Sequence, residues 1–114
     1  MQVTVETTAG LERKMRVVVP SDRVEDQVTE KIKQTAKQAK INGFRPGKVP
    51  LREVKRRFGA GIRQEVSSEV IQLTYGEALQ KEAINPAGMP TIEEVNMEEG
   101  KDLEYTAVFE VFPE

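Results

Sequence analysis

One short segment of the chain combines a large aromatic side chain, two cations and a backbone whose path is restricted. Its residues are Gly43, Phe44, Arg45, Pro46, Gly47, Lys48, Val49 and Pro50. Glycines and prolines at fixed positions define a turn, and a restricted backbone loses less entropy when it binds a partner. An apolar anchor beside a multi-donor cation is the usual composition of an interface hot spot. The segment is therefore the first candidate for a docking site.

Phe44 allows two interpretations. By residue type alone, a phenylalanine is more often a core residue, and here it would fold back between the flanking helices. Its neighbours Asn42, Gly43 and Arg45 are not core residues, and the helix before it loses its apolar stripe. We therefore interpret Phe44 as an exposed anchor at the tip of a loop.

Basic residues are concentrated in the middle of the chain. Between positions 31 and 63, eleven basic residues accompany one acid, Glu53, so this segment carries +10 although the whole chain carries −2. The basic residues are Lys31, Lys33, Lys37, Lys40, Arg45, Lys48, Arg52, Lys55, Arg56, Arg57 and Arg63. A solvated pair of helices would usually mix the two signs, so the segregation favours a docking surface for an anionic partner.

The composition excludes several kinds of catalytic and metal site. The 114 residues include no cysteine, histidine or tryptophan, which rules out disulfides, thiol catalysis and cysteine-type zinc sites. The acidic pairs Glu93-Glu94 and Glu98-Glu99 could suggest a metal or acid–base site. Adjacent strand residues point to opposite faces, however, and acids in turns are usually solvated. We expect a binding module with no catalytic residue, no metal and no cofactor.

No apolar run approaches the ~20 residues of a membrane helix, and the first ten residues lack the core of a signal peptide. We therefore expect a soluble, cytoplasmic protein with no membrane partner.

Strands are predicted at both ends of the chain. Val3 and Val5 alternate with polar residues, and a turn at Ala9-Gly10 leads to a second strand that Pro20 ends. A short strand is expected at residues 91–95 and a turn at 98–101. The residues predicted to face the core from the second and the last strand are Met15, Val17, Val19, Leu103, Tyr105, Ala107, Phe109 and Val111.

Helices are predicted between the strands. Ser21 or Asp22 is expected to cap the first helix, with a capping box from Asp22 to Glu25, and the helix is expected to end near Ile41-Asn42-Gly43 with Gly43 as a left-handed cap. Its apolar stripe is Val24, Val28, Ile32, Thr35 or Ala36, and Ala39, and it is poor after Ile32. A helix that starts with a core face and then loses it is expected to project from the core.

A short second helix opens at Pro50, and Gly59-Ala60-Gly61 is expected to interrupt it before a longer helix over residues 62–83. The inward residues of these two helices are predicted to be Leu51, Val54, Phe58, Val66, Val70, Leu73 and Leu79. The fold class is therefore α+β. We expect an antiparallel sheet from an N-terminal hairpin and C-terminal strands, helices packed on one face, and a projecting helix–loop–helix arm.

The loop residues resemble a family signature. The loop resembles the G-F-R-x-G-x-x-P loop of the trigger factor family at Gly43-Phe44-Arg45, Gly47 and Pro50. Members of this family are bacterial ribosome-associated chaperones. The resemblance covers the whole chain, since residues 3–7, 84–90 and 109–114 also look like that family's. It implies that residues 1–114 are an N-terminal ribosome-binding domain. The family continues into a prolyl-isomerase domain and a helical substrate-holding domain, and neither is expected here.

The resemblance also implies partners and residue roles. In the family the loop docks on a large-subunit ribosomal protein at the polypeptide exit tunnel, near ribosomal RNA, and the chaperone receives nascent or unfolded polypeptides. Phe44 would be the apolar anchor, Arg45 would pair with a carboxylate or phosphate, and Gly43 and Gly47 would shape the tip. Position 46 is basic in some members and is Pro46 here. Supporting charge would therefore come from Lys40, Lys48, Arg52, Arg56 and Arg57. A dimer is a further possibility.

A generic RNA-binding domain that uses the basic segment 31–63 is the alternative. Nothing in the sequence resembles a groove-reading helix or a stacking platform, and Phe44 and Phe58 are the only aromatic residues in that segment. Binding to naked RNA, compared with binding to intact ribosomes, distinguishes the two.

Overall fold

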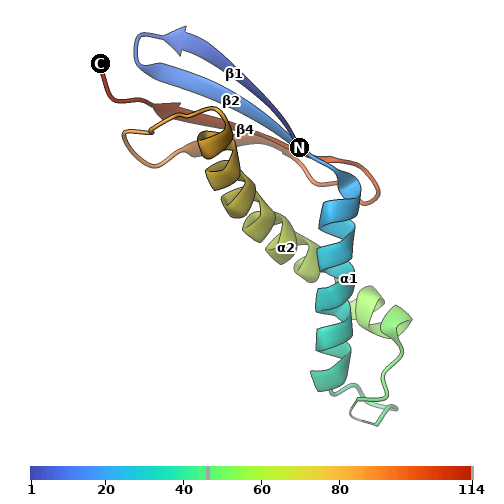
Figure 1. Cartoon of the computed structure of the whole chain (residues 1–114). Helices are drawn as coiled ribbons and strands as arrows, with labels where there is room; N and C mark the ends of the chain where they lie inside the picture. The colour runs from blue at the N-terminus through green and yellow to red at the C-terminus, as the bar shows by residue number, and fades with distance from the viewer. Residues whose placement is uncertain (46, 114) are drawn as a thin grey trace.

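The computed structural model describes residues 1–45 and 47–113 (Figure 1). Four strands and two helices follow one another along the chain. They are β1 (Gln2–Ala9), β2 (Glu12–Val19), α1 (Ser21–Gln38), α2 (Leu51–Lys81), β3 (Thr91–Asn96) and β4 (Leu103–Glu110). Strands at both ends with helices between them confirm the predicted α+β class.

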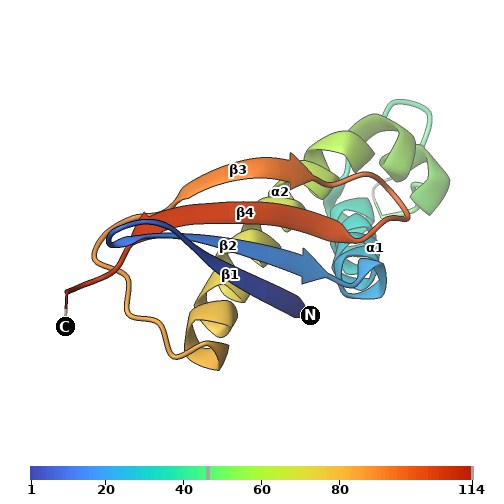
Figure 2. The ribbon, with the colours of Figure 1, turned by 90° about the horizontal axis from the view of Figure 1, so that it is seen from above.

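The strands form one antiparallel sheet in the order β1-β2-β4-β3 (Figure 2). β4 lies beside β2, so the two strands with the clearest alternation form the centre of the sheet. Met15 pairs with Ala107 and Val17 with Tyr105, and these side chains are fully or almost fully buried. The alternation of β2 and β4 is confirmed at every predicted inward position except Val111, which is half-buried.

The second half of α2 covers one face of this sheet (Figures 1 and 2). Thr74 of α2 and Tyr105 of β4 share a buried hydrogen bond between their hydroxyl oxygens at 2.7 Å. Tyr75 meets Phe109 edge to face, with ring centroids 6.0 Å apart. The core therefore lies between α2 and the central strands.

α1 and the first turns of α2 extend beyond the sheet as an arm (Figure 1). The Cα atoms span 62 × 23 × 20 Å and have a radius of gyration of 17.7 Å. A compact chain of this length would have a radius of gyration of roughly 13 Å. The predicted projecting arm is therefore confirmed.

The arm has its own buried residues, continuous with those beneath the sheet. They are Val24, Val28, Ile32, Ala36, Ile41, Val49, Val54 and Ile62. Ala36 continues the stripe of α1 beyond Ile32, since it is 7% exposed and belongs to the buried cluster that includes Ile41 and Val49. The distal half of α1 thus projects from the sheet but is not without a core.

The predicted caps of α1 are wrong. Its N-cap is Pro20, whose own side chain makes no capping hydrogen bond. Glu25 does not form a capping box because its carboxylate is bound by Arg63, and the Ser21 amide donates instead to Asp102 at 2.9 Å. The helix ends at Gln38, so Gly43 lies in the following loop and is not its cap.

α2 is one continuous helix of 31 residues, so the predicted interruption at Gly59-Ala60-Gly61 is wrong. Glycine in a helix interior costs about 1 kcal/mol relative to alanine, and the burial of Val54, Ile62 and Val66 offsets that cost. The first turns of the helix, green in Figures 1 and 2, run in a different direction from the rest.

The predicted inward faces of α2 are only partly right. Val54, Val66 and Val70 are buried, and Leu79 packs against the core. Leu73, in contrast, is 54% exposed, since Val70 and Thr74 occupy the side of the helix that faces the sheet. Leu51 and Phe58 are also exposed.

In the part of the chain that the structure describes, no helix is long and apolar enough to cross a membrane.

Candidate docking site at the arm tip

The described residues 42–45, 47 and 48 form the tip loop, which contains two hydrogen bonds of the turn type. The Phe44 amide donates to the Ile41 carbonyl at 3.1 Å, and the Lys48 amide donates to the Arg45 carbonyl at 2.9 Å. Gly43 and Gly47 occupy the third positions of these turns with φ of +93° and +79°. Positive φ at this position is typical of a type II turn and is far easier for glycine than for other residues. The two glycines therefore define the shape of the loop.

The tip loop is fixed at both ends by buried side chains. Ile41 precedes it and Val49 follows it, and each is only 6% exposed. Both belong to the buried cluster of the arm, together with Ile32, Ala36 and Val54. We did not single out these two residues from the sequence. The available signal was an apolar residue on each side of a segment rich in glycine and proline.

The Phe44 side chain is 42% exposed, although the residues that flank the loop are buried. The interpretation as a core residue is therefore wrong, and the exposed position expected from its neighbours is confirmed. Leu51 at 46% and Phe58 at 42% are the other large apolar side chains of the arm with comparable exposure. The arm thus presents an aromatic ring at its tip and a second one on α2.

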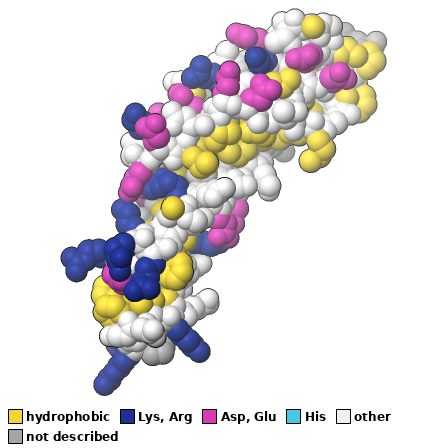
Figure 3. Space-filling model, turned by 180° about the vertical axis from the view of Figure 1, so that it is seen from behind, with side chains coloured by type: hydrophobic (Ala, Val, Ile, Leu, Met, Phe, Trp, Pro, Cys, Tyr) yellow, Lys and Arg dark blue, Asp and Glu magenta, His cyan; other side chains and the backbone are white. Residues whose placement is uncertain are grey.

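The eleven basic residues of the segment 31–63 fall into two groups. Ion pairs engage Lys31, Lys33, Lys55, Arg56, Arg57 and Arg63. Within residues 1–45 and 47–113, no ion pair involves the other five, the tip cations Lys37, Lys40, Arg45, Lys48 and Arg52. All five are exposed and lie at the end of α1, in the tip loop or at the start of α2. Figure 3 shows Lys and Arg side chains gathered at this end of the molecule.

Arg56 and Arg57, which we predicted as supporting cations, share one carboxylate. Both bind Glu53 on the same face of α2, Arg57 at 3.0 Å. Hydrogen bonds from Arg56 and then Arg57 lower the pKa of Glu53 to about 2. Because Glu53 stays ionised, it offsets part of their charge at neutral pH. The unpaired Lys37, which the sequence did not single out, contributes more freely to the tip.

The structure places the predicted loop residues together but does not describe all of them. Gly43, Phe44, Arg45, Gly47 and Lys48 lie in the tip loop. Pro50 is the N-cap of α2. Lys40 and Arg52 flank the loop, whereas Pro46 lies outside the described residues.

Three of the four residues in the acidic pairs have structural partners. Glu94 accepts a hydrogen bond from the Thr106 hydroxyl at 3.0 Å, Glu98 pairs with Lys101 at 2.9 Å, and Glu99 pairs with Lys55 at 2.9 Å. No group of three or more acidic side chains among the described residues could hold a metal ion. These acids therefore contribute to the contacts of the fold.

Comparison with known proteins gives consistent results. All residues 1–114 match the family model described as bacterial trigger factor protein. The trigger factor of Pseudomonas fluorescens (strain Pf0-1) is 59% identical over 114 residues, which are 100% of this chain and 26% of that protein. The trigger factor of Thioalkalivibrio sulfidiphilus is 56% identical over 113 residues, 99% of this chain and 26% of that protein.

A solved structure described for promiscuous substrate recognition in folding and assembly by the trigger factor chaperone has a TM-score of 0.74. The match covers 100% of this chain and 27% of that one, and its 15% identity supports the fold alone. The chain thus spans about a quarter of the length of the relatives that it matches. With the family model matched from end to end, the chain belongs to the trigger factor family.

Proposed function

We propose that residues 1–114 dock a nascent-chain chaperone on the large ribosomal subunit at the polypeptide exit tunnel. The tip loop is the contact, and the docked chaperone supports the folding of nascent or unfolded polypeptides in the cytoplasm. The observation that carries this proposal is the tip itself. A half-exposed phenylalanine lies on a loop with two turn-type hydrogen bonds among five exposed cations without ion pairs in the described chain, at one end of a projecting arm.

The chemistry of the tip defines its partner. Phe44 requires an apolar recess, and Arg45 requires a carboxylate or phosphate that accepts several hydrogen bonds. The other tip cations favour a polyanion, since neutralised phosphates release counterions. A ribosomal protein that lies next to ribosomal RNA offers all three features on one surface.

Co-sedimentation with ribosomes tests the proposal. Phe44→Ala and Arg45→Ala should each weaken binding by roughly 2 kcal/mol, about thirty-fold in Kd, because truncated hot-spot residues have effects of this size. Phe58→Ala is the matched control, since Phe58 is equally exposed on the same arm but outside the loop. The Kd of this variant for ribosomes should stay within two-fold of the wild-type value. Pelleting of both loop variants at wild-type level would remove the loop from the docking site.

The five tip cations also favour a second candidate, a generic RNA-binding domain. Naked ribosomal RNA would then bind nearly as well as intact ribosomes, and Phe44→Ala would have little effect. On the docking proposal, the intact ribosome binds much more tightly than the RNA, and binding weakens steeply as the salt concentration rises.

We further propose that these 114 residues have no prolyl-isomerase activity. Such an activity requires an aromatic-lined pocket around proline, whereas Tyr75, Tyr105 and Phe109 are packed in the core. Phe44 and Phe58 lie on separate elements. A peptide isomerisation assay should show only the uncatalysed rate, and acceleration that survives repurification would contradict the expectation.

A further inference from the structure

The glycines in the middle of α2 lie at the base of the arm. Gly59 and Gly61 are inside the helix, and each lowers its local stability by about 1 kcal/mol relative to alanine. Glycines are also among the few recognised causes of helix bends, and the direction of α2 changes in this region (Figures 1 and 2). α2 is the one described element that takes part in both the arm and the sheet layer. Residues 59–61, which we call the glycine hinge, place two such glycines within three positions, whereas Gly76 stands alone further along α2.

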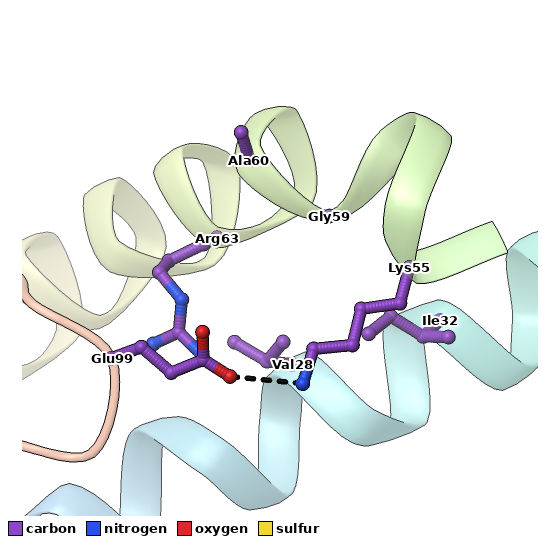
Figure 4. A pocket seen from close by; sticks show the side chains of 7 residues that line it. All are labelled: Val28, Ile32, Lys55, Gly59, Ala60, Arg63 and Glu99. Atoms are coloured by element: carbon purple, nitrogen blue, oxygen red, sulfur yellow. Dashed lines mark ion pairs between the residues drawn. The ribbon is translucent and has the colours of Figure 1, made fainter. Parts of the chain in front are cut away.

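Charged residues of α2 flank the glycine hinge on both sides, and a third residue joins them. Lys55 lies one turn before Gly59, and Arg63 lies two residues after Gly61. Glu99 lies in the connection between β3 and β4. Its carboxylate forms an ion pair with the Lys55 ammonium at 2.9 Å and lies 3.8 Å from the Arg63 guanidinium (Figure 4). One carboxylate thus spans the hinge, and we call Lys55, Glu99 and Arg63 the Glu99 bridge.

Further hydrogen bonds and ion pairs join α1 to α2 and to the connection between β3 and β4. Arg63 binds the Glu25 carboxylate of α1 through both of its terminal nitrogens, at 2.7 and 2.8 Å. The Gly100 amide donates to the same carboxylate at 3.3 Å. The Asp102 carboxylate accepts from the Ser21 amide, the first residue of α1. The connection therefore contacts both helices of the arm where they leave the sheet.

Small residues make room for the Glu99 bridge. Gly59 and Ala60 line a pocket together with Val28 and Ile32. The Lys55 side chain extends along this pocket to Glu99 (Figure 4). A Cβ atom on Gly59 would lie 3.3 Å from Cγ of Lys55, tighter than most such contacts. A Cβ on Gly61 would meet nothing within 4 Å. Gly59 is thus constrained by the bridge, whereas Gly61 could be alanine without a clash.

We propose that α2 hinges at Gly59-Ala60-Gly61 and that Glu99 fixes the direction of the arm by joining Lys55 to Arg63 across the hinge. Glu99 is a positioning residue, since it lies at the base of the arm and not at its tip. Its importance for docking rests on the proposed function. The hinge itself is a property of the free protein and is tested without ribosomes.

Amide hydrogen exchange of the 114-residue chain tests the hinge. Glu99→Gln should speed exchange at residues 59–65 roughly two- to five-fold, the factor that corresponds to a surface ion pair. Glu98→Gln is the matched control, because Glu98 is the neighbouring acid, is similarly exposed and pairs at 2.9 Å with Lys101 inside the connection. It should leave exchange at residues 59–65 unchanged.

The cysteine-free sequence allows a second measurement with two spin labels, one at Gln38→Cys near the tip and one at Thr4→Cys on β1. Glu99→Gln should broaden the distance distribution between them, and 1 M NaCl should broaden that of the unsubstituted protein in the same way. Glu98→Gln should leave it unchanged.

A second substitution separates a hinge from a general loss of stability. Gly61→Ala strengthens the helix without a clash, so the double variant with Glu99→Gln should return both readouts toward wild type. The proposal is overturned if Glu99→Gln has no effect, if Glu98→Gln has the same effect, or if Gly61→Ala fails to restore exchange. Faster exchange in Glu99→Gln with unchanged ribosome binding would contradict only the docking role.

Discussion

Tyr105 and Phe44 are aromatic residues in different regions of the molecule, and the first is buried whereas the second is exposed. Tyr105 is 1% exposed beneath the sheet, and its hydroxyl is bonded to Thr74. Phe44 is 42% exposed at the arm tip, on a loop whose two neighbouring side chains, Ile41 and Val49, are buried. The first contributes to the fold through burial, whereas the second is held in place by its neighbours.

The two regions also differ in how many of their cations form ion pairs. Nine of the twelve Lys and Arg residues outside the tip form ion pairs, such as Arg16 with Glu104, Arg23 with Glu77 and Lys31 with Glu65, although Arg13, Lys14 and Lys81 form none within the described chain. The tip cations have none among the described residues. The comparison indicates that stability resides in the sheet and in the arm core, whereas affinity for an anionic partner resides in the loop. The predictions below test whether the two can be separated.

The largest effect is expected from Tyr105→Ala. It should lower the free energy of unfolding by about 3–5 kcal/mol, since it leaves a cavity and removes the partner of Thr74. Phe44→Ala, measured in the same urea titration, should change it by less than about 0.5 kcal/mol. A comparable loss for both variants would show that the tip aromatic also stabilises the fold.

The second prediction compares the arm core with the sheet core through two fully buried valines. Val54→Ala should favour opening of the arm by about 2 kcal/mol, so amides of residues 33–38 should exchange roughly thirty-fold faster. Val17→Ala in β2 should speed exchange in the strands but leave those arm amides unchanged, because the sheet remains folded when the arm opens. Equal acceleration of the arm amides by Val17→Ala would mean that arm and sheet unfold as one unit.

The third prediction concerns paired and unpaired cations at the tip. Glu53→Gln frees Arg56 and Arg57, and on the proposed function it should tighten ribosome binding about two- to five-fold and steepen its salt dependence. Glu98→Gln removes the same charge far from the tip and is the control. Unchanged binding by Glu53→Gln would show that these arginines do not face the partner.

The pKa of Glu53 provides an independent check of the same pairs. Because the pKa is lowered from 4.5 to about 2, the contribution of the ion pairs is complete above about pH 4.5 and is lost as the pH falls through 2. An NMR titration of the Glu53 carboxyl carbon should show this low midpoint, and Arg56→Gln should raise it.

The sequence was sufficient where one residue type has one structural role. The alternation of Met15, Val17 and Val19 placed the central strand, because a period of two exposes one face of a strand to the core. Gly43 and Gly47 indicated a restricted loop because few other residues adopt positive φ. The exposure of Phe44 followed from its neighbours, although its type alone suggested burial.

The remaining features depend on contacts between residues far apart in the chain. Glu25 fits a capping box locally, but Arg63, 38 positions later, binds it more strongly. Lys55 and Arg56 are adjacent basic residues in the sequence, yet Lys55 pairs with Glu99 and Arg56 pairs with Glu53. Which cations remain unpaired at the tip therefore becomes visible only in the structure. Leu73 was misassigned because the inward side of α2 depends on where the sheet lies.

The smallest expected effect is a gain of stability at the end of α2. The Ile84 amide donates to the Leu79 carbonyl at 2.9 Å and the Ala83 amide donates to Gln80 at 3.2 Å, a Schellman motif with Ala83 at the left-handed position, φ +52°. Glycine avoids the Cβ strain of that conformation, so Ala83→Gly should stabilise the protein by about 0.5–1 kcal/mol.

Chemical denaturation measures this gain, and Ala60→Gly is its control because Ala60 lies inside α2 without positive φ. That substitution should destabilise by about 1 kcal/mol. If stability and docking reside in separate regions, Ala83→Gly raises the midpoint of unfolding and leaves ribosome binding unchanged. A stabilised variant with altered binding would show that the end of α2 and the tip are energetically coupled.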